Sequence, residues 1–264
     1  MFKAETADLD KILAYLRKDT GKCLYIYIDI TIYGLDKDFL DVWYDEDEQG
    51  VSLVVMRYHD AFQIYTDREE WDIDGVLRLA EEYDIQALHG KRDIIDALGS
   101  RIGDGYTAHY GVVLKGGKPR SHGLGDEDRV EEARPEDADE IAALMCTDVF
   151  WSSVYDEKVL ASQLRERMET GMGRSFVIRD NGKIIVHDAT FAETDDVAVV
   201  SGMMVHKDYR NTMLGGTMEY YVSRRMADEG KQVYFMIVEV KRAHLFEKLG
   251  NTIVTEYGKW VKDV

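Results

Sequence analysis

Apolar side chains recur along the chain with two periods, which together predict a mixture of helices and strands. Spacings of three and four residues predict helices over 7–18, 73–83, 91–99, 156–170, 215–229 and 241–249, and over a stretch that begins at Pro135. Alternating or continuous apolar runs predict strands over 51–58, 61–66, 85–89, 106–114, 130–134, 175–179, 184–191, 197–205, 232–239, 252–256 and 259–262. The sequence therefore predicts an α/β protein of the α+β type.

Short polar turns separate several of the predicted strands. Asn181-Gly182 lies between two of them and is a strong signal for a two-residue hairpin. His59-Asp60 occupies the same position between the strands 51–58 and 61–66. The acidic run 45–48 is expected to form a solvated hairpin tip.

One segment has the composition of a joint between domains. Residues 116–125 hold four glycines and one proline, and the acidic run 126–128 follows them. We therefore place a domain boundary here, with one mixed α/β domain over 1–128 and a second over 129–264.

The charge balance narrows the range of partners. The chain has 33 Lys+Arg against 51 Asp+Glu, a formal net charge of −18. Such an acidic protein is poorly suited to nucleic acid, and its field favours a cationic small molecule such as an amine. Cys23 and Cys146 are too sparse for a disulfide framework or a structural zinc site, and no metal site is expected. Without a signal peptide or a long apolar run, the chain is expected in the cytoplasm and not in a membrane.

Residues 203–216 carry the clearest chemical signal. They leave a predicted strand, make a turn and open a predicted helix, whose first backbone N–H groups form an anion site. Arg210 adds a fixed positive charge, and Gly215 and Gly216 allow a phosphate to approach the backbone. The predicted pyrophosphate cradle consists of Met203, Met204, Val205, Arg210, Asn211, Thr212, Met213, Leu214, Gly215, Gly216 and Thr217.

This stretch resembles the GNAT superfamily of N-acyltransferases, which reads Val-His-Pro-x-Tyr-Arg-Gly-x-Gly-x-Gly here. The segment 242–250 is similar to the family's Ala-x-x-x-Tyr-x-Lys-x-Gly, and 187–193 with 200–202 is similar to two-domain bacterial members. The resemblance covers roughly 130–264. It implies a central mixed, mostly antiparallel sheet in the second domain, with acetyl-CoA bound along the strand and at the cradle. It also implies that the first domain is a degenerate GNAT-like half.

The chain departs from the family at four positions. Asn211 and Met213 replace loop glycines, and a Cβ at a position that needs positive φ costs roughly 1–2 kcal/mol. Phe246 replaces the tyrosine that protonates the departing thiolate in family members, and it has no proton to give. Glu239 stands where an asparagine often ends the fifth strand. Phe246 is nevertheless expected beside the bound acetyl-CoA.

Three residues are candidates for the base that deprotonates an amine: Glu239, His187 and Glu193. A backbone N–H near Met204 or Val205 is expected to polarise the thioester carbonyl. Two of the base candidates have a structural alternative. His187 lies in an alternating strand, as a packing histidine would, and Glu239 lies beside two cations, as in a surface ion pair.

The acceptor site is the least defined part of the prediction. Trp151, Ser152, Ser153 and Tyr155 lie between two predicted helices where the family shapes this site, although they also fit an ordinary connection. We expect an acetyl-CoA-dependent N-acetyltransferase that acts on a primary amine of a small molecule or peptide. The alternative is a non-catalytic CoA-binding or protein-interaction module. The sequence does not fix the oligomeric state, and a homodimer is one option.

Overall fold

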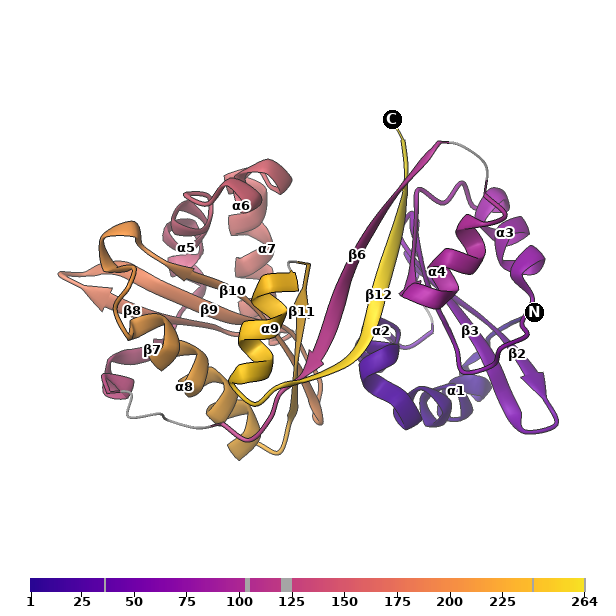
Figure 1. The fold of residues 1–264 in the computed structure, drawn as a ribbon, viewed down its shortest axis with the longest axis horizontal. Helices are drawn as coiled ribbons and strands as arrows, with labels where there is room; N and C mark the ends of the chain where they lie inside the picture. The colour runs from indigo at the N-terminus through magenta and orange to yellow at the C-terminus, as the bar shows by residue number, and fades with distance from the viewer. Residues whose placement is uncertain (36, 103–104, 120–124, 239, 264) are drawn as a thin grey trace. The chain divides into compact units, whose positions relative to one another are not determined.

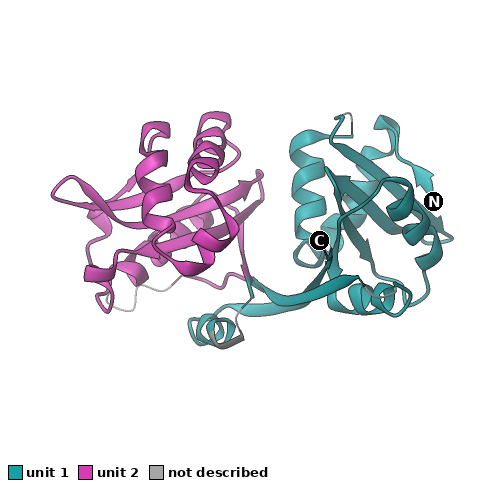
Figure 2. Cartoon of the chain, turned by 90° about the horizontal axis from the view of Figure 1, so that it is seen from above, with its two compact units in different colours: residues 1–114, 237–264 teal, residues 115–236 magenta. Residues whose placement is uncertain are grey.

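The computed structural model describes residues 1–35, 37–102, 105–119, 125–238 and 240–263. The chain forms two compact units (Figure 2). Unit 1 combines Met1–Leu114 with Ile237–Val264, and unit 2 is Lys115–Met236. The C-terminal segment is thus part of the unit that the N-terminal half builds. The predicted domain boundary between residues 128 and 129 stays a prediction. No helix in the described part of the chain has the length and apolarity needed to span a membrane.

Unit 1 is a sheet with helices. Its strands are β1 (Phe2–Lys3), β2 (Leu40–Asp47), β3 (Gly50–Tyr58), β4 (Ala61–Thr66), β5 (Ala87–Lys91), β6 (Tyr106–Lys115) and β12 (Thr252–Lys262). Its α-helices are α1 (Leu9–Leu16), α2 (Leu24–Tyr33), α3 (Ile73–Glu82), α4 (Arg92–Gly99) and α9 (Val240–Lys248). Strands β1 to β4 pair antiparallel, β5 runs parallel to β4, and β12 pairs antiparallel with β5.

The core of unit 1 explains most of the predicted elements. Apolar residues of the strands, such as Leu53, Phe62 and Leu88, form one cluster with Val76 of α3 and Ile95 of α4. The predicted acidic tip is confirmed, because β2 ends at Asp47 and β3 begins at Gly50. The two strands predicted over 252–256 and 259–262 form the single strand β12.

Helix α2 was not predicted from the sequence. Its sequence, LYIYIDITIY, is rich in β-branched and aromatic residues, which favour strands. The segment is helical in the structure, and Leu24, Tyr27, Ile28 and Ile30 are all buried. Burial around much of the helix circumference removes the one-sided apolar stripe from which a helix is normally recognised.

Unit 2 is a sheet covered by helices on both faces (Figure 1). Its strands are β7 (Val130–Glu132), β8 (Ser175–Asp180), β9 (Lys183–Glu193), β10 (Val197–Val205) and β11 (Gln232–Ile237). Its α-helices are α5 (Ala138–Met145), α6 (Val149–Val154), α7 (Glu157–Thr170) and α8 (Leu214–Asp228). Strands β7 to β10 pair antiparallel, and β11 runs parallel to β10. Alternation along β8 separates the faces, since Val177 packs with α5 and α7, whereas Phe176 contacts Tyr221 of α8.

The hairpin between β8 and β9 is confirmed. Asn181 and Gly182 have φ of 49° and 79°, and Asp180 pairs with Lys183 across them. Positive φ at both central residues is the conformation that Asn-Gly turns favour. The turn sets the register of the pairs next to it, and the register shifts by one residue between Ile178 and Arg179, before the part of the strands that carries Ser175 and His187.

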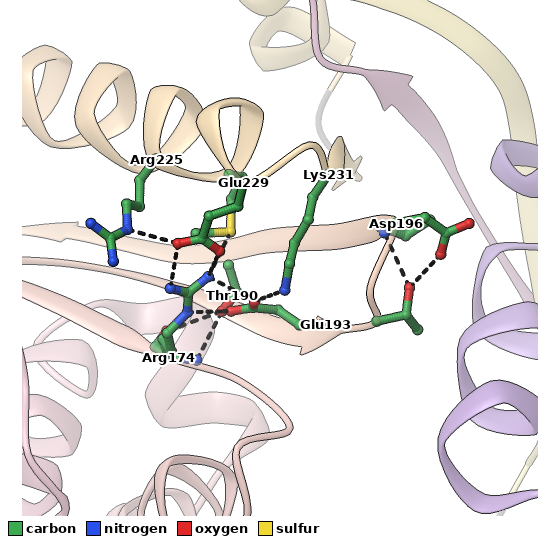
Figure 3. Close-up of polar contacts among 10 residues, drawn as sticks. Arg174, Thr190, Glu193, Asp196, Arg225, Glu229 and Lys231 are labelled. Atoms are coloured by element: carbon green, nitrogen blue, oxygen red, sulfur yellow. Dashed lines mark hydrogen bonds and ion pairs between the residues drawn. The ribbon is translucent and has the colours of Figure 1, made fainter.

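A polar network ties the end of β9 to the end of α8 (Figure 3). The Arg174 guanidinium binds both carboxylate oxygens of Glu193, at 2.9 and 2.8 Å, and both of Glu229, at 2.9 and 2.7 Å. Lys231 and the Thr190 hydroxyl also donate to Glu193. Burial raises the pKa of Glu193, but these donors outweigh burial and hold it below its ordinary value. Hydrogen bonds from Arg174 lower the pKa of Glu229 to about 2 despite partial burial.

This network makes the stability of unit 2 depend on pH, with lower stability in acid. The folded-state pKa values of Glu193 and Glu229 both lie below the ordinary value of 4.5, so the two carboxylates contribute fully to the free energy of unfolding above pH 4.5. This contribution is lost as the pH falls from 4.5 towards 2. We expect Glu193→Gln to lower the free energy of unfolding by about 1–3 kcal/mol at pH 7 and to flatten its decline in acid. Urea unfolding between pH 7 and pH 3 measures both effects.

Glu131→Gln is the matched control. Glu131 is 54% exposed in its pair with Arg179, and surface pairs contribute about 0–1 kcal/mol. Equal stability of the two variants, with an unchanged acid slope, would refute this role of Glu193.

Candidate active site

One edge of β10 is open. The strand pairs with β11 only over Val197–Val199, opposite 232–234, and the described residues of unit 2 include no further pairing between these strands. The register with β9 on the other side shifts at the same place, after Val199, and again between Ser201 and Met204. Such a bulge bends a strand and ends its regular pairing. The backbone of 200–205 therefore presents an edge to which an extended ligand can add as a strand would.

Glycine is favoured in this bulge. Gly202 has a φ of 93°, which L side chains rarely adopt. A Cβ here would lie 3.0 Å from Cε1 of Phe191 and 3.4 Å from Cε1 of His187. A side chain here would therefore be strained by the backbone conformation and crowded by Phe191 and His187.

His187 stabilises the bulge from β9. Its Nδ1 lies 2.9 Å from the Gly202 carbonyl oxygen, and its Nε2 lies 3.2 Å from the Ser175 hydroxyl. A carbonyl only accepts, so Nδ1 carries the hydrogen and Nε2 accepts from Ser175. Complete burial lowers the pKa of His187 to about 4, although the Gly202 carbonyl opposes this. The geometry favours a neutral positioning residue over a base.

The open edge leads into a turn and then into α8. A 3-10 helix over Lys207–Tyr209 follows β10, and the Tyr209 hydroxyl donates to Asp180 at 2.6 Å. Arg210 donates from Nε to the Val205 carbonyl at 3.3 Å. A Cβ on Gly215 would lie 3.2 Å from Cγ2 of Val205, so the first turn of α8 lies against the end of β10. Edge, turn and helix N-terminus are therefore contiguous.

The positive φ in this turn falls on Asn211, not on Met213. Asn211 has a φ of 67°, whereas Met213 has a φ of −78° and is the N-cap of α8. Asparagine tolerates the left-handed region better than most residues, so the turn forms without the family's glycines. The Met213 side chain does not cap the helix and is 63% exposed beside the first turn.

The other predicted cradle residues differ in their surroundings. Met204 is buried in the cluster beneath α5 and α7, while Met203 and Val205 are partly exposed. Thr212 donates to the Tyr209 carbonyl at 2.6 Å, and Thr217 is fully buried and donates to the Gly125 carbonyl at 2.8 Å. The hydroxyls of both threonines are thus engaged within the protein.

Three predicted site residues remain: Glu193, Phe246 and Glu239. Glu193 accepts from Arg174, Lys231 and Thr190, and its lowered pKa makes it a poor base. Phe246 lies on α9 in unit 1, where it is 8% exposed. Glu239 lies outside the described residues.

An aromatic cluster lies beside the bulge in unit 2. The ring of Trp151 is 5.7 Å from that of Tyr155 and 6.0 Å from that of Phe191, measured between centroids. The hydroxyls of Ser152 and Ser153 donate to carbonyls of their own helix, those of Asp148 and Phe150. Of the four predicted acceptor-site residues, Trp151 contacts the sheet through Phe191, and Tyr155 stacks on Trp151.

Two residues near the bulge were missed from the sequence. Ser175 is an inconspicuous first residue of β8, and the register shift between Ile178 and Arg179 places it diagonal to His187. Arg167 lies on α7 with its guanidinium carbon 4.8 Å from the centre of the Phe191 ring. Nothing in the local sequence separates Arg167 from the other charged residues of that helix.

Comparisons with known proteins identify the fold. No sequence-family model matches the chain, and no curated protein sequence does so either. Among solved structures, it is similar to a GNAT-family acetyltransferase from Colwellia psychrerythraea, with TM-score 0.60, 10% identity, and 99% and 98% of the two chains covered. It is also similar to a tandem GNAT protein from the clavulanic acid biosynthesis pathway, with TM-score 0.58, 15% identity and coverages of 98% and 96%.

A third similar structure is a GCN5-related N-acetyltransferase-like protein from Streptococcus suis, with TM-score 0.55, 14% identity and coverages of 98% and 100%. These matches span both halves of the chain, which confirms the predicted fold class. The chain has the two-domain GNAT fold.

Proposed function

We propose that this chain is an acetyl-CoA-dependent N-acetyltransferase that acts on a primary amine of a small molecule or peptide. The observation that carries the proposal is the open edge of β10, whose end lies against the first turn of α8. A strand edge offers N–H and C=O groups to an extended amide chain, and a helix N-terminus attracts phosphate. Few ligands other than CoA combine an extended amide arm with a diphosphate.

The residues around this edge fit acetyl-CoA. Met203 and Val205 would pair with the pantetheine arm, and the first turn of α8 with Arg210 would hold the diphosphate. The net charge of −18 opposes an anionic ligand, but salt screens charges beyond about 8 Å. Binding therefore depends on the local charge of Arg210 and Lys207. In the described residues, no group of His, Cys, Asp and Glu could hold a metal ion.

The transfer needs one base and one electrophilic contact. The amine nitrogen bonds to the thioester carbonyl carbon, the carbon–sulfur bond breaks, and CoA leaves as the thiolate. The nitrogen loses its proton to a base, for which we propose Glu239, because the proton-accepting atoms of His187 and Glu193 are engaged. A backbone N–H near Met204 or Val205 would polarise the carbonyl, and proximity supplies about 7–11 kcal/mol of the barrier. Phe246 donates no proton, so the thiolate leaves unassisted or takes one from water.

The alternative function is a non-catalytic CoA-binding or protein-interaction module on the same scaffold. Two features favour it, the exposed Met213 beside the first turn of α8 and the missing proton donor at Phe246. Catalytic turnover separates the two functions, because a module binds acetyl-CoA without releasing thiol.

Arg210→Ala tests the cradle. Loss of one charge-assisted hydrogen bond costs about 1.5–3 kcal/mol, so the Kd for acetyl-CoA should rise about 10- to 100-fold in calorimetric titration. Arg224→Ala is the control, because Arg224 lies farther along α8 and is 54% exposed. If Arg210→Ala binds acetyl-CoA with an unchanged Kd, Arg210 does not hold the diphosphate and the predicted cradle is wrong.

Met213→Gly tests whether the methionine side chain crowds the phosphate position. Its removal should tighten acetyl-CoA binding, since Met213 is exposed at the helix start and makes no capping bond. Calorimetric titration measures the change, and weaker binding would refute the crowding.

Glu239→Gln tests the proposed base. The neutral amide cannot accept the proton, so turnover should fall about 10²-fold or more, with the Kd for acetyl-CoA unchanged. Thiol release from acetyl-CoA in the presence of an amine reports turnover. Glu247→Gln is the control, since this carboxylate is 41% exposed and pairs with His244. Equal turnover in the two variants would exclude Glu239 as the base.

A further inference from the structure

Arg167 has no acidic partner among the described residues. Its Nη1 is buried and makes no hydrogen bond, and the contact of its guanidinium is the face of Phe191. Arg165, two positions earlier on α7, pairs with Asp139 at 2.7 Å, and Arg174 binds two carboxylates. In a chain with 51 acidic and 33 basic residues, a partly buried arginine without an acid is unexpected.

Such an arrangement costs stability. A guanidinium N–H that is removed from water without an acceptor loses a strong hydrogen bond. A cation–π contact with the Phe191 ring offsets part of this free-energy cost. Groups held at a cost in the folded protein are candidates for ligand binding, since a ligand can supply the missing partner.

The position of Arg167 connects it to the open edge of β10. Phe191 carries the guanidinium on its face and lies against Gly202 at the bulge. Trp151 approaches the same ring from α6, with 6.0 Å between centroids. One aromatic ring therefore separates the unpaired cation from the strand along which the acetyl group would be presented.

We propose that Arg167 binds a carboxylate of the acceptor, so that the acceptor is an amino carboxylic acid. This inference rests on the proposed function and names its substrate class. A guanidinium matches the two oxygens of a carboxylate, and the pair is strongest where water is excluded. One arginine balances one carboxylate, whereas a phosphate carries nearly two charges and needs more cations.

The overall charge agrees with a zwitterion. A net charge of −18 repels a free anion, but an amino carboxylic acid has no net charge and its ammonium group is attracted. Arg167 is only partly buried as a whole residue, so part of its side chain is accessible from solvent.

Matched acceptor pairs test the proposal. Phenylalanine and phenethylamine differ only in the carboxylate, as do 4-aminobutyrate and propylamine. The amine and the carboxylate are separated by one carbon in phenylalanine and by three in 4-aminobutyrate. In the wild type, kcat/KM for acetyl transfer should be at least about 10-fold higher for one of the acids than for its matched amine. Arg167→Gln should lower that acid's kcat/KM about 10- to 100-fold and change the value for the amine by less than about threefold.

Two further variants separate recognition from structure. Arg165→Gln removes the same charge from the same helix and should leave the preference intact. Arg167→Lys should restore a part of it, because the charge returns without the planar fork. The melting temperature of Arg167→Gln should equal or exceed that of the wild type, since an unpaired cation is lost. A fall of several degrees, or an equal loss with acid and amine, would show a structural role and overturn the proposal.

Direct titration distinguishes failure of this inference from failure of the proposed function. Phenylalanine and 4-aminobutyrate are titrated into the wild type and Arg167→Gln without acetyl-CoA. Arg167-dependent binding without any acetyl transfer would keep the carboxylate site and refute the transferase. Transfer to amines with no preference for an acid would keep the transferase and refute the carboxylate site.

Discussion

The bulge at Gly202 is the constraint on which the candidate site depends. Strand β10 stops pairing with β11 where its register with β9 first shifts, and so its last six residues have an open edge. Glycine is favoured here, because φ is positive and a Cβ would be crowded by Phe191 and His187. Both ring nitrogens of His187 make hydrogen bonds, one with Gly202 and one with Ser175, and the bond with Gly202 stabilises the bulge.

Local signals predicted most of the fold. The Asn181-Gly182 turn, the strand before 206 and the helix after 213 follow from side-chain period and turn chemistry, which act over a few residues. Helix α2 escaped prediction because tertiary burial overrides the strand preference of LYIYIDITIY. The return of 237–264 to the first unit is likewise a long-range event that no local pattern encodes.

The site was predictable where it depends on backbone and not where it depends on contacts. Arg210 and Gly215 lie in the turn and helix start that their sequence context indicated. The environments of His187 and Glu193 are set by partners 12 to 38 residues away, such as Ser175, Gly202, Arg174 and Lys231. Arg167 stands out only because its buried Nη1 has no hydrogen-bond partner among the described residues. The sequence cannot show that such a partner is missing.

The central claim is that acetyl-CoA pairs with the open edge of β10. Amide hydrogen exchange of the full chain, with and without saturating acetyl-CoA, tests it most directly. The account predicts slower exchange at the amides of 200–205 and of the first turn of α8, with little change in β7 and β8. Binding that leaves these amides unprotected, or that protects a different strand, would contradict it.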